Sequence, residues 1–171
     1  MLGARTAHYS PANDAISRLA AVHAPTRAAM TAGFVAFGVG VPLYGLALRS
    51  TLPGRAWMLA TATGLATLGV GAFPLDWARG DAPHAVAATL GYVTLAATPL
   101  VAARTLGRQG RRGWARVSRV AGVTSAVSLA ATVIGPYHGA FQRVGLTVGD
   151  AWIVASALGI VARRRHRCPR P

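Results

Sequence analysis

The chain has 171 residues, of which 53% are hydrophobic, and it carries a formal net charge of +14. Its arginines flank apolar segments, and no basic patch is interleaved with aromatic residues, so this composition excludes nucleic acid as a partner and favours a membrane protein. The single cysteine, Cys168, excludes an internal disulfide and a cysteine-rich metal site.

Residues 1–26 form a polar segment that precedes the first apolar stretch. Ser10 followed by Pro11 is typical of a helix start, because the hydroxyl can cap the helix and proline has a preset φ at the first helical position. Ile16, Leu19 and Ala20 then fall on one helical face. The pattern predicts a short amphipathic helix that lies on the outer membrane surface.

Five apolar stretches follow, and each is long enough to cross about 30 Å of hydrocarbon as a helix of about 20 residues. They predict an all-α protein, a five-span membrane bundle over residues 27–163 with a basic cytoplasmic tail at 164–171. The predicted spans are residues 28–48, 56–75, 85–103, 120–137 and 144–162.

Small residues recur at helical spacing in four of these spans, and helices in a membrane need such residues where they pack closely. The spacing predicts the packed faces. These rows are Ala32, Ala36 and Gly40; Ala60, Gly64, Thr67 and Gly71; Gly122, Ala126 and Ala130; and Ala151, Ala155 and Gly159.

Arginine is distributed unequally over the two sides of the predicted bundle. One side holds 13 of the 18 arginines, in the loops after the first and third spans and in the tail, whereas all four aspartates lie on or near the other side. By the positive-inside rule the arginine-rich side is cytoplasmic. The sequence therefore predicts a multi-pass protein of the cell membrane, with its N-terminus outside and its C-terminus in the cytoplasm.

Several short motifs are distributed along the chain: Tyr9-Ser10-Pro11, Ile16 to Ala21, Ala24-Pro25, Gly33-Phe34 and Gly38, and Phe73-Pro74 with Asp76 and His84. Together they resemble a multi-pass prokaryotic membrane family known as domain of unknown function 998, and the resemblance covers most of the chain. The resemblance implies a bundle of membrane-spanning helices and does not imply an activity.

Two residues depart from the family pattern. Arg18 stands where the family usually has glutamate, and Ala20 where it has glycine, so a role that needs that carboxylate is not expected here. The family generally has six spans, with one before the Tyr-Ser-Pro motif. The resemblance therefore implies that this chain lacks the first span of the family.

Polar residues that could carry chemistry gather toward the outer ends of the spans. They are Asp76, His84, His138 and Asp150, and the last of these lies roughly 10 Å below the outer boundary of its span. An ionisable residue inside a membrane indicates a functional site by default. Asp150 could equally be neutralised by Arg143, two turns earlier on the same helix.

Two classes of function remain open. The first is a non-enzymatic bundle that binds membrane lipids, a protein partner or a second copy of the chain; Ser10, Asp14, Arg18 and Arg143 are its candidate lipid- or partner-binding residues. The second is a hydrolase of lipid amides or esters with catalytic residues among Asp76, His84, His138 and Asp150. No cofactor is predicted for the first class, whereas the second would use zinc on Asp76, His84 and His138. Transport or a proton relay through Asp150 is a third reading.

Overall fold

The computed structural model describes the backbone of residues 9–167 and the side chains of residues 9–163. Cys168, Arg5 and the end of the predicted tail lie outside the described residues. Within them the chain is all-helical, without strands, which confirms the predicted class. The elements are the 3-10 helix η2 (Ile16–Ala20) and the α-helices α1 (Arg27–Arg49), α2 (Ala56–Ala72), α3 (Ala82–Arg108), α4 (Arg112–Ala131) and α5 (His138–Arg167).

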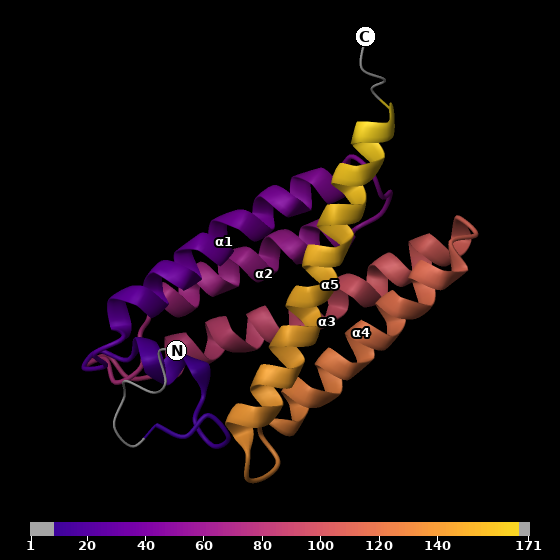
Figure 1. Cartoon of the computed structure of the whole chain (residues 1–171). Helices are drawn as coiled ribbons and strands as arrows, with labels where there is room; N and C mark the ends of the chain where they lie inside the picture. Colours follow the sequence, from indigo (N-terminus) through magenta and orange to yellow (C-terminus); the bar gives the residue numbers. More distant parts are fainter. Residues whose placement is uncertain (1–8, 168–171) are drawn as a thin grey trace.

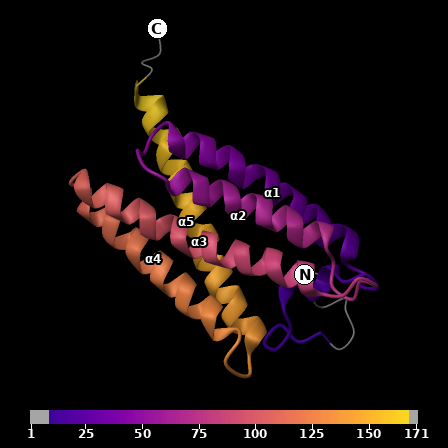
Figure 2. The same cartoon turned by 180° about the vertical axis from the view of Figure 1, so that it is seen from behind.

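Helices α1 to α4 lie side by side in chain order, each packed along the next (Figure 1). Helix α5 crosses one face of this layer, as the view from behind also shows (Figure 2). We call the end with η2 and the loops at 73–81 and 132–137 the acid end. The opposite end, with the loops at 50–55 and 109–111 and the end of α5, is the arginine end.

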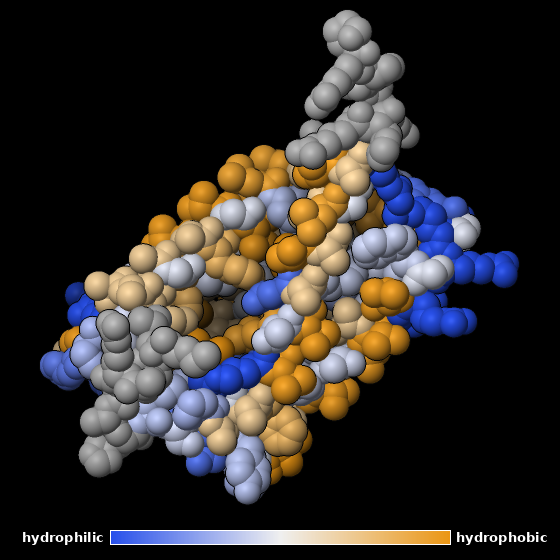
Figure 3. All heavy atoms as spheres, viewed as in Figure 1, coloured by the Kyte–Doolittle hydropathy of each residue, from blue (hydrophilic) through white to orange (hydrophobic). Residues whose placement is uncertain are grey.

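Many large apolar residues are exposed in this protein, whereas a water-soluble protein would bury most of them. The interior contains many small side chains, among them Ala60, Ala102 and Ser125, each fully buried. Large apolar side chains face outward on all five α-helices of the described chain, and hydrophobic residues cover much of the face that Figure 3 shows. Such a surface is stable in hydrocarbon and costly in water, so the arrangement is that of a membrane protein.

Three of the described helices are long and apolar enough to cross a membrane, namely α1, α3 and α5 as far as Arg163. Helix α5 begins at His138, six residues before the predicted span at 144–162, and the other two helices also differ from the predicted spans. Helix α2 has 17 residues and ends at Ala72 rather than Leu75. Helix α4 begins at Arg112 rather than Val120, because arginine is a good helix former and the charged stretch is part of the helix. It ends at Ala131 rather than Tyr137. Apolar windows locate hydrocarbon-compatible segments and do not detect helix ends.

The packed faces differ from two of the predicted rows of small residues. Ala32, Ala36 and Gly40 of α1 are exposed, as are Ala151 and Ala155 of α5. Helix α1 instead meets α2 through Gly38, where a Cβ would lie 2.5 Å from Leu68 and 3.1 Å from the Gly64 carbonyl oxygen. Helix α5 meets α4 through Gly145, whose carbonyl accepts a 2.8 Å hydrogen bond from the Ser125 hydroxyl. Small residues occur on every face of these helices, so their spacing does not select the packed one.

Candidate functional site

The N-terminal segment, residues 9–26, is fastened to the start of α5 by Arg143. Its Nη1 donates hydrogen bonds to the carbonyl oxygens of Pro11 at 2.6 Å, Asp14 at 3.1 Å and Gly139 at 2.8 Å. Its Nη2 donates to the Tyr9 hydroxyl, and the guanidinium also lies over the Tyr9 ring. The expected pair between Arg143 and Asp150 does not form, because the guanidinium turns toward the carbonyl groups of Pro11, Asp14 and Gly139.

Two further residues of α5 complete this attachment. The Gln142 side chain accepts a hydrogen bond from the Ile16 N–H at 2.7 Å and donates one to the Tyr92 hydroxyl of α3. At Gly139 a Cβ would lie 2.6 Å from the Pro11 carbonyl oxygen and closer still to that of Asp14. Only glycine permits this approach of the two backbones.

The N-terminal segment contains a short helix, η2, but this helix does not begin at Ser10 as predicted. Ser10 and Asp14 close a single turn, in which the Ser10 N–H donates to the Asp14 carboxylate at 2.7 Å. The chain then extends at Ala15 and turns again as η2, whose residues Leu19 and Ala20 are buried. The candidate binding residues Ser10, Asp14 and Arg143 therefore hold the segment in place.

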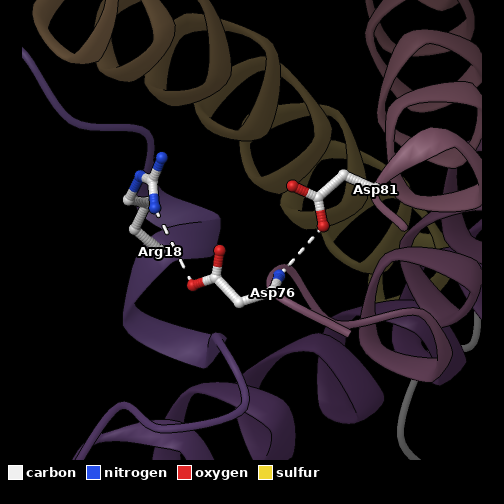
Figure 4. A network of polar contacts seen from close by, with 3 residues as sticks. All are labelled: Arg18, Asp76 and Asp81. Atoms are coloured by element: carbon white, nitrogen blue, oxygen red, sulfur yellow. Dashed lines mark hydrogen bonds and ion pairs between the residues drawn. The ribbon is translucent and has the colours of Figure 1, made fainter. Parts of the chain in front are cut away.

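Arg18 and Asp76 lie at the surface of the acid end. Arg18 Nη1 is 3.8 Å from Asp76 Oδ2, and both side chains are about half exposed (Figure 4). Asp76 has a positive φ of 60°, and its N–H donates to the Asp81 carboxylate at 2.9 Å. An exposed ion pair of this kind contributes little to stability. The backbone of Asp76 stabilises the loop through its hydrogen bond to Asp81.

The two candidate histidines have different environments. His138 is exposed at the start of α5, and its Nδ1 donates to the Thr132 carbonyl oxygen at 2.7 Å, which closes the preceding loop. His84 is 5% exposed, and its Nδ1 donates to the Phe73 carbonyl oxygen at 2.7 Å. Since Nδ1 carries the proton, Nε2 of the neutral ring is an acceptor.

A cavity of about 360 Å³ lies in the acid half of the bundle, between η2, α1, α2, α3 and α5. Helices α1 and α5 make few contacts with each other, and the surface is hollowed between them (Figure 3). Much of the wall is apolar and includes Met30, Phe34, Phe37, Val70, Leu95 and Leu146. The polar side chains that reach it are Ser17, Thr63, Thr67, His84, Tyr92, Gln142, Thr147 and Asp150.

Asp150 is the unusual member of this wall. Its Oδ1 is buried and, among the described residues, is the one buried side-chain polar atom without a hydrogen-bond partner. The preceding residue, Gly149, allows α5 to pack on α3, since a Cβ there would lie 2.7 Å from Leu95. An unsatisfied carboxylate oxygen at this depth is costly, and a donor in the cavity would satisfy it.

The four candidate catalytic residues do not converge. His84 and Asp150 line the cavity, whereas Asp76 pairs with Arg18 at the surface and His138 closes a loop. In the described part of the chain, no group of three or more His, Cys, Asp or Glu residues could hold a metal ion. The geometry therefore does not assemble the zinc ligands that a hydrolase would need.

Sequence reasoning missed Gly139, Gln142 and Tyr92. Gln142 falls in the predicted loop between the spans 120–137 and 144–162, where a polar residue is expected, so its burial in α5 at 5% exposed could not be detected from the sequence. Gly139 and Tyr92 carried no signal either, because Gly139 falls in the same predicted loop and a single tyrosine within a span, such as Tyr92, does not by itself indicate a contact.

Comparison with known proteins identifies the family of the chain. A sequence model of the family described as "Protein of unknown function (DUF998)" matches residues 1–159. The chain belongs to this family. No curated protein and no solved structure matched the chain.

Proposed function

We propose that this DUF998 protein is a multi-pass membrane protein in which all five α-helices cross the bilayer. Exposed large apolar residues occur on the two helices that are shorter or more charged as well as on the others; they include Met58 and Leu65 on α2, and Val117, Val120, Val123 and Val127 on α4. Both helices pack along neighbours that are long enough to span. A neighbour that stopped short would leave these side chains in water.

In the proposed orientation the acid end and the N-terminal segment face outward and the arginine end faces the cytoplasm of the cell. Of the described arginines, Arg18, Arg27, Arg79 and Arg143 lie at the acid end. The other nine, Arg49, Arg55, Arg104, Arg108, Arg111, Arg112, Arg116, Arg119 and Arg163, lie toward the arginine end. This asymmetry supports the orientation through the positive-inside rule.

Single cysteines on a Cys168→Ser background test the orientation. Ala78→Cys, in the loop at the acid end, should react with a membrane-impermeant maleimide in intact cells. Ser50→Cys, in the loop at the arginine end, should react only after permeabilisation. The reverse pattern would overturn the orientation, and labelling of both in intact cells would place α2 outside the set of crossing helices.

The cavity is proposed to bind an amphipathic molecule that enters from the bilayer between α1 and α5. Its apolar wall suits a hydrocarbon chain, and the open side lies between two helices that would face lipid. The observation that carries this proposal is the unpartnered Asp150 Oδ1, which calls for a hydrogen-bond donor. A primary ammonium group supplies both donors and the opposite charge, so we propose an amine-bearing amphiphile as the ligand class.

Two probes with the same chain and opposite head groups, dodecylamine and dodecanoate, test this assignment. Native mass spectrometry of the purified protein should show saturable binding of dodecylamine in preference to dodecanoate. Asp150→Asn should remove the preference, because it keeps the shape and loses the charge. Equal selectivity in the unmodified protein and in Asp150→Asn would overturn the proposal.

A second pair of variants tests the place of binding. Gly33 lines the cavity, and a Cβ added there would meet only open space, so Gly33→Leu should fill the cavity and weaken dodecylamine binding about tenfold. Gly40 lies two turns further along α1, is equally unobstructed and does not line the cavity. Gly40→Leu is therefore the matched control, and equal losses in both variants would exclude the cavity as the binding site.

A further inference from the structure

A second pocket, of about 300 Å³, lies at the arginine end of the bundle. It is bounded by the end of α1 and its following loop, the end of α3, the start of α4 and the last turns of α5. Buried apolar side chains form part of its wall: Leu48, Leu52, Leu106 and Trp152. Arg111 and Arg163 belong to the same lining.

The charge of these two arginines is not compensated within the described part of the chain. Neither guanidinium forms a hydrogen bond or an ion pair with another described residue. Burial lowers the pKa of Arg111, and repulsion from Arg163 lowers it further. The nearest aspartate along α5 is Asp150, which lies about 20 Å from Arg163 along the helix axis. Hydrophilic residues gather around the loop between α3 and α4 at this end (Figure 3).

The start of α4 strengthens the preference for a negative charge. Arg111 is the N-cap of this 20-residue helix, no side chain caps it, and its first turn contains no acid. The helix dipole therefore adds positive potential at the place where Arg111 and Trp114 line the pocket. Two arginines and a helix N-terminus together favour an anion with several acceptor oxygens, such as a phosphate.

We propose that this pocket binds the phosphate head group of an anionic lipid, with its acyl chain against the apolar wall. A lipid fits better than a free phosphate because the pocket combines a cationic rim with buried leucine and tryptophan side chains. Its position at a helix-end loop corresponds to the head-group level of the bilayer. The inference rests on the proposal that the helices cross the membrane. It does not depend on which ligand binds the cavity that Asp150 lines.

Matched double variants test the proposal in delipidated, detergent-purified protein titrated with phosphatidylglycerol or phosphatidylcholine. Native mass spectrometry should show tighter, saturable binding of phosphatidylglycerol. Arg111→Gln with Arg163→Gln should weaken this binding about tenfold. Arg112→Gln with Arg116→Gln removes the same charge from exposed positions outside the pocket and should change it less than about twofold. Equal losses in the two pairs would overturn the pocket assignment.

Two further measurements separate the remaining outcomes. Arg111→Lys with Arg163→Lys preserves the charge and should retain a preference for phosphatidylglycerol with about threefold weaker binding; a loss of all preference in this folded variant would overturn the proposal. Inorganic phosphate at about 10 mM should not displace the lipid, because it lacks the apolar contacts. Displacement by phosphate would identify a free-anion site instead. Failure of the dodecylamine experiment would leave these results unaffected.

Discussion

The two ends of the bundle are built by different means. At the acid end an irregular segment is held by hydrogen bonds between residues far apart in the chain, such as Ile16 with Gln142 and Pro11 with Arg143. At the arginine end the loops are closed by local bonds, such as those from the Thr51 hydroxyl to the Ala47 and Leu48 carbonyl oxygens. Hydrogen bonds between distant residues are therefore concentrated at the acid end, whereas most of the described arginines lie at the arginine end.

The two ends meet different physical requirements. Arginines at a membrane surface can set orientation without a defined partner, because water and lipid phosphates solvate them. A non-helical segment beside hydrocarbon must instead have its backbone groups satisfied by the protein. The acid end meets this requirement with a side chain, Arg143, that serves three carbonyl groups. The cavity lined by Asp150 lies in the same half of the bundle.

The largest effect on this comparison is expected from Gly139→Ala. The added Cβ would overlap the carbonyl oxygens of Pro11 and Asp14 and should release the N-terminal segment, although alanine favours helix α5 itself. Amide hydrogen exchange in residues 9–21 should become roughly 100-fold faster, with α5 still protected. Gly135→Ala, where a Cβ meets nothing within 4 Å, is the control. Unchanged exchange in Gly139→Ala would show that the segment is not docked there.

Arg143→Gln should have the next largest effect. The shorter side chain cannot serve the three carbonyl groups at once, so local opening of the segment should become easier by about 2 kcal/mol, or roughly 30-fold faster exchange. Arg79→Gln is the control, because Arg79 is exposed and stacks on Trp77. Equal effects of the two substitutions would mean that arginines act alike at the acid end, through charge alone.

Asp76→Asn should have the smallest effect. Asparagine tolerates the positive φ at this position, so the substitution isolates the exposed ion pair with Arg18. Thermal unfolding of the purified protein should shift by no more than about 0.5 kcal/mol in stability, and the shift should vanish at high salt. A large loss that persists in salt would place Asp76 among the residues that fasten the acid end.

Sequence reasoning identified the helical class, the family and the unequal distribution of arginine. It was less accurate for the ends of α4, because a charged helix extends beyond its apolar part. For the site it named His84 and Asp150, which line the cavity, together with Asp76 and His138, which do not. Distance along the chain could not separate these residues, since each lies near the outer end of a predicted span.

Local properties of the sequence determined that the chain forms apolar helices and which end carries the charge, because hydropathy and charge act residue by residue. The tertiary structure decided which helix faces are packed, through Gly38 and Gly145 rather than the rows at Ala32 and Ala151. It also decided that Arg143 binds the N-terminal segment and leaves Asp150 Oδ1 without a partner. Those outcomes depend on contacts between distant segments, and a chain rich in alanine and glycine offers many alternative faces for such contacts.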